Sequence, residues 1–253
     1  MIGAAGHGWG LALFPLAASV FAIVFAANLL RRFVSRRRPH EGVWALALLM
    51  YAAASFAMFL GVARGWETID FRVYWLFGAV LNVPFLFMGE LYLLLRRRAL
   101  GHACLAALVV LAAFAASKVA RAALSAPALG KTLPLGKDVF ENGSAPYRLA
   151  QFYSLPAYFL LLFGLAWSAW GMKGRPELRD RTIGTFAIAV GATIVAIGSG
   201  IGAAFNVVVL FSVSLAAGIA VMFWGFLRAS ARRGPPPAGD PEPARAEPAK
   251  RGE

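Results

Sequence analysis

Long runs of apolar residues, separated by short polar and mostly basic stretches, recur along this 253-residue chain. A run of about 20 apolar residues can cross the ~30 Å hydrocarbon core of a bilayer as an α-helix. The pattern therefore predicts an all-α, polytopic bundle of seven transmembrane helices within residues 1–230. The predicted helices cover about 9–30, 43–62, 73–95, 102–120, 148–170, 182–201 and 206–227.

Three segments refine this interpretation. Residues 182–227 contain no charged residue and no proline, and they are too long for one crossing, so we expect two helices with a turn at the glycine cluster 198–202 and Asn206. Residues 125–146 are too polar to span a bilayer and should lie outside it. Residues 231–253 are rich in Pro, Gly, Ala, Arg and Glu, a composition that predicts a disordered cytoplasmic tail.

Composition and charge place the protein in a membrane. With 60% hydrophobic and 15% charged residues, it does not resemble a soluble globular domain. The net charge of +13 comes mainly from basic residues at the ends of apolar runs, which favours contacts with anionic lipid headgroups over nucleic-acid binding. Fifteen Lys and Arg fall on one side of the predicted helices and seven on the other. Because the richer side is normally cytoplasmic, we expect the N-terminus outside and the C-terminus inside.

The many arginines and alanines are typical of a GC-rich bacterial genome, so the predicted location is the bacterial inner (plasma) membrane, crossed several times.

Two predicted helices carry a polar face. In the third, residues at alternating steps of three and four share one face, whereas Val80, Phe87 and Leu94 should point away from it. In the fifth, polar residues follow the same spacing. If these faces meet, they line an outward-facing pocket, with Asn206 at the last turn. The candidate ligand-binding residues are Trp75, Asn82, Gln151, Ser154, Tyr158 and Asn206.

The same residues have a second interpretation. Small and polar side chains also allow membrane helices to pack closely and to hydrogen-bond to one another. In that case Gly78 and Gly89 should touch neighbouring helices and no void should remain. The sequence leaves both the packing seam and the pocket open.

Glu90 is the one acidic residue inside a predicted helix. An intramembrane acid can be a proton or cation site. Glu90 is also close to the predicted cytoplasmic end of its helix, where it could reach the membrane interface or pair with Arg31 or Arg32. We favour the second interpretation.

The sequence shows no pattern typical of an enzyme. The three histidines are scattered, Cys104 is the only cysteine, and no catalytic or metal-binding motif is present. We therefore expect no catalytic residues, no metal and no cofactor.

The seven predicted helices, with residues 72–77 at the start of the third, resemble those of microbial rhodopsins. However, those proteins attach retinal to a lysine in the last helix, and residues 207–227 contain no lysine.

Residues 78–87 are similar to residues 202–211, as the two copies of a duplicated unit are in the three-plus-one-plus-three sugar transporters.

The leading hypothesis is a non-enzymatic binding, sensing or accessory protein with a small-molecule or lipid ligand. The alternative is a small-solute transporter with its site between the third, fifth and seventh helices. Homo-oligomers are compatible with both hypotheses.

Overall fold

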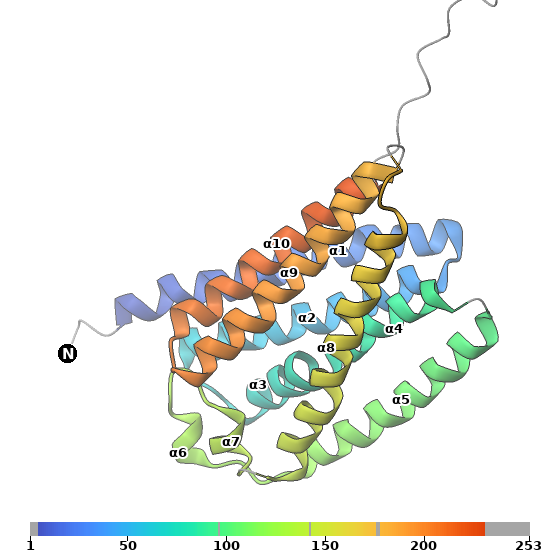
Figure 1. The fold of residues 1–253 in the computed structure, drawn as a ribbon. Helices are drawn as coiled ribbons and strands as arrows, with labels where there is room; N and C mark the ends of the chain where they lie inside the picture. The colour runs from blue at the N-terminus through green and yellow to red at the C-terminus, as the bar shows by residue number, and fades with distance from the viewer. Residues whose placement is uncertain (1–4, 96, 142, 176–177, 231–253) are drawn as a thin grey trace, which may run out of the picture.

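The computed structural model describes residues 5–95, 97–141, 143–175 and 178–230 (Figure 1). The predicted all-α fold is confirmed within these residues, because they form no strand and include seven helices long and apolar enough to cross a membrane. The tail at 231–253, for which the sequence predicts disorder, lies outside the described residues.

Six spans are single helices, and most extend a few residues beyond their predicted limits. Basic residues at the edge of the hydrocarbon region do not interrupt a helix, because their long side chains reach the headgroups. The third span, Thr68–Leu94, is divided into α3 (Thr68–Val73), η1 (Tyr74–Leu81) and α4 (Asn82–Leu94). The single helices are α1 (Ala5–Arg36), α2 (Pro39–Arg64), α5 (Arg98–Arg121), α8 (Ala145–Gly171), α9 (Arg179–Ala204) and α10 (Val208–Ser230).

The segment η1 is a π-helix, in which the backbone bonds span five residues instead of four. The Asn82 N–H accordingly bonds to Phe77 O. The wider turn changes the angle between successive side chains, so the face predicted from α-helical spacing is wrong at Val80. Val80 is fully buried rather than directed away from the bundle. Leu94, beyond the π-helix, is exposed as expected.

The helices α9 and α10 form a close antiparallel pair (Figure 1). Glycines spaced seven residues apart bring the two backbones together, and a Cβ at Gly191 would lie 2.6 Å from Gly218 O. Asn206 joins the helices in a left-handed conformation, with φ of 55°, which asparagine tolerates better than most residues. The glycine cluster 198–202, expected at the turn, lies inside α9 and packs against Phe211 and Ser214.

The other helices complete the bundle around a central space. α1 packs against α2 and α10, while α4 contacts both α2 and α8. α5 lies at the edge, against α4, η1 and α8, and most of its side chains are exposed (Figure 1). Exposed apolar side chains on a membrane helix face lipid, so α5 is a peripheral span.

Residues 123–141 form a folded cap over one end of the bundle instead of a simple loop. The cap contains two short helices, α6 (Ala126–Leu129) and α7 (Gly136–Val139). It packs on the end of the second span and the start of the third, where Trp66 Nε1 donates to Thr132 O at 3.0 Å. Because Leu133, Val139 and Phe140 are buried, the cap has a small apolar core of its own.

Candidate functional site

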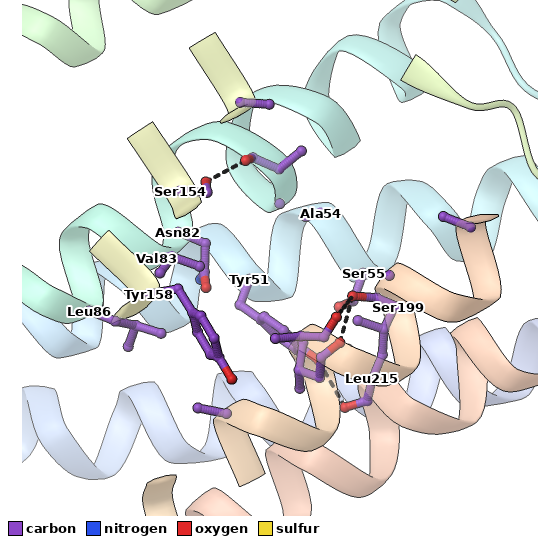
Figure 2. A pocket seen from close by; sticks show the side chains of 18 of the residues that line it. Tyr51, Ala54, Ser55, Asn82, Val83, Leu86, Ser154, Tyr158, Ser199 and Leu215 are labelled. Atoms are coloured by element: carbon purple, nitrogen blue, oxygen red, sulfur yellow. Dashed lines mark hydrogen bonds between the residues drawn. The ribbon is translucent and has the colours of Figure 1, made fainter. Parts of the chain in front are cut away.

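A cavity of about 660 Å³ lies in the middle of the bundle, between α2, η1, α4, α8, α9 and α10 (Figure 2). It occupies the space between the third and fifth spans, where the sequence predicts a pocket, and also reaches the second, sixth and seventh. Among the described residues, none with a charged side chain lines it. The lining residues with polar side-chain atoms are Tyr51, Ser55, Tyr74, Trp75, Asn82, Tyr147, Gln151, Ser154, Tyr158 and Ser199.

Five of the six candidate ligand-binding residues lie on this cavity. Trp75 and Asn82 are buried, Ser154 and Tyr158 are half-buried, and Gln151 is exposed at the rim. The exception is Asn206. It is exposed at the α9–α10 turn, and its N–H bonds to Ala203 O at 3.3 Å, so its role there is to form the turn.

Ser154 connects α8 to the π-helix. Its Oγ donates to Ala79 O at 2.5 Å and lies 3.3 Å from Val80 O. Pro84 explains why a hydroxyl is needed here, because proline has no N–H, and in the π-helical pattern its bond would go to the carbonyl five residues earlier, Ala79 O. Serine side chains commonly satisfy such freed carbonyls in membrane helices. Ser154 is therefore a packing residue as well as part of the cavity wall.

Three further polar side chains link the helices around the cavity. Asn82 Nδ2 donates to Ala47 O at 2.8 Å and Tyr51 Oη to Leu215 O at 2.8 Å, while Tyr158 Oη is 3.3 Å from Thr193 Oγ1. Figure 2 shows Asn82, Tyr51 and Tyr158 around the cavity, each from a different helix. Because a donor of each is already used within the protein, their oxygen atoms remain available as acceptors.

The two glycines on the third span's polar face touch side chains rather than a helix backbone. A Cβ at Gly78 would lie 3.1 Å from Ala54 Cβ, and Gly89 packs against the indole of Trp44. The seam is therefore tightly packed at these points, yet the void between Asn82, Ser154 and Tyr158 remains. The sequence presented packing and pocket as alternatives, whereas the structure contains both.

Aromatic residues close the end of the cavity beneath the cap. The Trp75 ring lies 5.5 Å from that of Phe140 and is stacked with that of Tyr147 at 6.4 Å. Its Nε1 donates to Pro146 O at 3.1 Å. Gly136 in α7 packs directly on the Trp75 ring, at a position where any Cβ would overlap it. Trp75 is consequently only 8% exposed.

The exposed lining residues define a mouth on the side of the bundle. They are Gln151 and Leu155 on α8 and Ile197 and Gly200 on α9; Leu155 is 58% exposed and Ile197 is 55% exposed. Figure 1 shows why the mouth lies here, since α8 and α9 converge at the end of α8 and diverge towards the cap. These residues lie on the side of the bundle between α8 and α9, and an opening towards the outer surface stays a prediction.

Several wall residues are not among the candidates predicted from the sequence. Tyr51 and Ser55 lie one helical turn apart on α2, and this i, i+4 pair of polar residues in an otherwise apolar helix was an available signal. Ser199 was hidden within the glycine cluster. Its Oγ donates to Val195 O at 2.5 Å, a bond within its own helix.

Glu90 lies outside the cavity, one turn beyond the lining residue Leu86. Its side chain is 2% exposed, and Ser168 Oγ on α8 donates to Glu90 Oε1 at 2.9 Å. The expected pairing with Arg31 or Arg32 is wrong. Arg32 Nε lies 3.2 Å from Glu41 Oε1 instead, and within the described residues Glu90 forms no ion pair.

Neither a metal centre nor a known relative offers a further guide to function. In the described part of the chain, no three His, Cys, Asp or Glu residues are placed to hold a metal ion. Comparison of the chain with protein-family models, curated proteins and solved structures gives no match.

Proposed function

We propose that this integral membrane protein is a non-enzymatic binding protein whose ligand is an uncharged, largely apolar molecule. The cavity carries this proposal, because a space of about 660 Å³ whose described lining residues include no charged side chain suits such a ligand. An ion would lose its hydration there without gaining a partner, at a cost of several kcal/mol. At about 30 Å³ per water-sized group, the cavity has room for roughly twenty such groups.

We further propose that the protein lies in the inner membrane of a bacterium, with its N-terminus and cap outside. The excess of basic residues on the opposite side supports this orientation. Exposed arginines at those helix ends, such as Arg31, Arg36 and Arg98, would contact anionic headgroups.

Co-purification tests the binding proposal directly. The protein is purified in a mild detergent, and the bound small molecules are extracted and identified by mass spectrometry. The variant Ala196→Phe places a ring in the cavity, whereas Ala107→Phe adds the same ring to an exposed position on α5. We expect at least one uncharged compound that is retained by wild type and by Ala107→Phe and depleted at least tenfold in Ala196→Phe. Equal retention by all three proteins would contradict the proposal.

Small-solute transport is the second candidate, because α4, α8 and α10, from the third, fifth and seventh spans, all line the cavity. A duplicated unit would require α8–α9 to pack like α1–α2. However, α1 and α2 pack along much of their length, whereas α8 and α9 diverge (Figure 1). Flux of the co-purified compound across protein-containing vesicles, above that of the Ala196→Phe variant, would favour transport.

A further inference from the structure

We propose that the cavity is loaded sideways from the bilayer, through the mouth between α8 and α9, by a single-chain lipid with a hydroxyl group. This inference rests on the proposed binding function and identifies the class and the source of the ligand. Three features of the cavity support it: the position of its mouth, the closure of its capped end, and the hydrogen-bonding groups on its wall.

On α8 the mouth reaches the depth of the hydrocarbon core, whereas on α9 it extends to Gly200, four residues or about 6 Å from the end of that helix. Leu155 is ten residues into the 27-residue α8, which at 1.5 Å per residue places it about 15 Å from the helix start. Phe152 and Phe159, one turn before and after it, are 72% and 60% exposed. Large exposed apolar side chains at this depth face lipid chains, so a molecule at the mouth comes from the membrane.

Aromatic side chains cover the capped end of the cavity. Trp75 and Tyr147 stack across it, and Phe140, itself 3% exposed, covers Trp75 from the cap. The hydrogen bond from Trp75 Nε1 to Pro146 O holds the indole in this position. A ligand that entered through the cap would have to displace these rings, whereas a lipid-soluble ligand meets no such barrier at the mouth.

The wall favours a ligand that donates a hydrogen bond. Asn82, Tyr51 and Tyr158 each use a donor on a protein acceptor, and Asn82 Oδ1 is left as a strong acceptor beside the void. An alcohol provides one donor and no charge. With room for roughly twenty methylene-sized groups, the cavity suits a chain of about that many carbons.

Photolabelling in vesicles tests this inference. The probe is hexadecanol with a mid-chain diazirine, dissolved in phosphatidylcholine vesicles that contain the full-length protein. After illumination, labelled residues are located by peptide mass spectrometry. We expect label at interior lining residues such as Tyr51 and Leu215, each only 8% exposed. Unlabelled hexadecanol should compete for these positions at least fivefold better than its methyl ether, which cannot donate a hydrogen bond.

Two tryptophan variants test the route. A Cβ at Gly200 would meet no atom within 4 Å, so Gly200→Trp narrows the mouth without displacing the core. Gly171 has the same free space at the far end of α8 and does not line the cavity, so Gly171→Trp is its control. After probe-loaded and protein-containing vesicles are mixed, interior labelling should develop at least fivefold more slowly in Gly200→Trp and at the wild-type rate in Gly171→Trp.

The remaining outcomes separate this inference from the proposed function. Interior labelling at the wild-type rate in Gly200→Trp would overturn the lateral route. Equal competition by hexadecanol and its methyl ether would overturn the proposal that the ligand needs a hydroxyl group. If the interior stays unlabelled while another uncharged compound co-purifies and is lost in Ala196→Phe, the inference fails and the binding function stands. If no compound co-purifies and the interior stays unlabelled, both fail.

Discussion

The hydroxyl of Ser154 on α8 donates a 2.5 Å hydrogen bond to the carbonyl oxygen of Ala79 in the π-helix η1. This contact joins the third and fifth spans at the wall of the cavity, and its acceptor lies five residues before Pro84, which has no N–H for the π-helical bond to that carbonyl. One serine thereby compensates for a break in a neighbouring helix and fixes the width of the space between them.

Removal of this hydroxyl should destabilise the protein. Ser154→Ala is expected to lower the free energy of unfolding by about 1 kcal/mol, because the half-buried carbonyl of Ala79 loses its partner. Thermal unfolding in detergent measures the change. Ser117→Ala, which removes an exposed hydroxyl bonded within its own helix, is the control and should have almost no effect. In a Pro84→Ala background, where residue 84 regains an N–H, Ser154→Ala should lower the free energy of unfolding by less. An equal loss in both backgrounds would show that Ser154 does not compensate for Pro84.

The contact between Gly136 and Trp75 should be intolerant of a methyl group. Gly136→Ala forces a Cβ into the indole ring, and overpacking of this kind costs about 1–3 kcal/mol. Gly130→Ala, in the same cap, is the matched control, since its Cβ would have only Pro127 O nearby at 3.5 Å. We expect a lower melting temperature and faster proteolysis at Lys137 in Gly136→Ala only. Identical behaviour of the two variants would mean that the cap does not depend on this contact.

Arg32 should contribute more to stability than its neighbour Arg31. Its Nη1 donates to Ser230 Oγ at 2.6 Å, its guanidinium lies 5.0 Å from the Phe226 ring, and its Nε faces the buried Glu41. Arg32→Ala leaves that carboxylate without its partner. Because Arg32 is partly exposed, we expect a loss of about 2 kcal/mol, below the ~3–5 kcal/mol of a fully buried pair.

Chemical or thermal unfolding in detergent checks this prediction. Arg31→Ala removes an exposed arginine and should change stability by less than about 0.5 kcal/mol. Addition of Glu41→Gln to Arg32→Ala should restore part of the loss, because the unpaired charge is then gone. If the second substitution restores nothing, Arg32 acts through Ser230 and Phe226 alone.

Glu90 should tolerate glutamine but not leucine. Glu90→Gln keeps an oxygen for the hydrogen bond from Ser168, so we expect a stability change within about 0.5 kcal/mol. Glu90→Leu removes the acceptor and leaves the Ser168 hydroxyl without it, at a cost of about 1 kcal/mol. The stability changes of both variants are measured from melting temperatures in detergent. If glutamine proves as damaging as leucine, the carboxylate charge itself is required, which would favour the proton or cation site.

Cysteine labelling should establish the orientation. In a Cys104→Ala background, Lys131→Cys in the cap and Ser35→Cys at the end of α1 are both exposed to an impermeant maleimide. Intact cells should label at residue 131 only, and permeabilised cells at both. Labelling of intact cells at residue 35 alone would reverse the predicted topology.

The number and approximate limits of the spans followed from the sequence, because the ability of a segment to cross the hydrocarbon core depends only on its own length and composition. A run of apolar residues crosses the membrane whatever its neighbours are, so seven helices could be predicted residue by residue. The interior position of Asn82 followed for a similar reason, since an amide exposed to lipid loses its hydrogen bonds. The π-helix did not follow, because regular α-helical spacing was assumed through Pro84, and Val80 was therefore assigned to the wrong face.

The cavity and its mouth depend on how helices far apart in sequence are tilted. α9 is held against α10 by glycine contacts, and α8 diverges from α9 towards the cap, so a space remains that Tyr51, Asn82 and Tyr158 reach from three helices. Asn206 has the polarity of a ligand-binding residue, but the α9–α10 turn places it away from that space. Glu90 likewise bonds to Ser168, while Arg32 pairs with Glu41. Polarity and spacing assign a residue to the interior of the bundle, whereas only the packing of all the helices determines which partner it meets there.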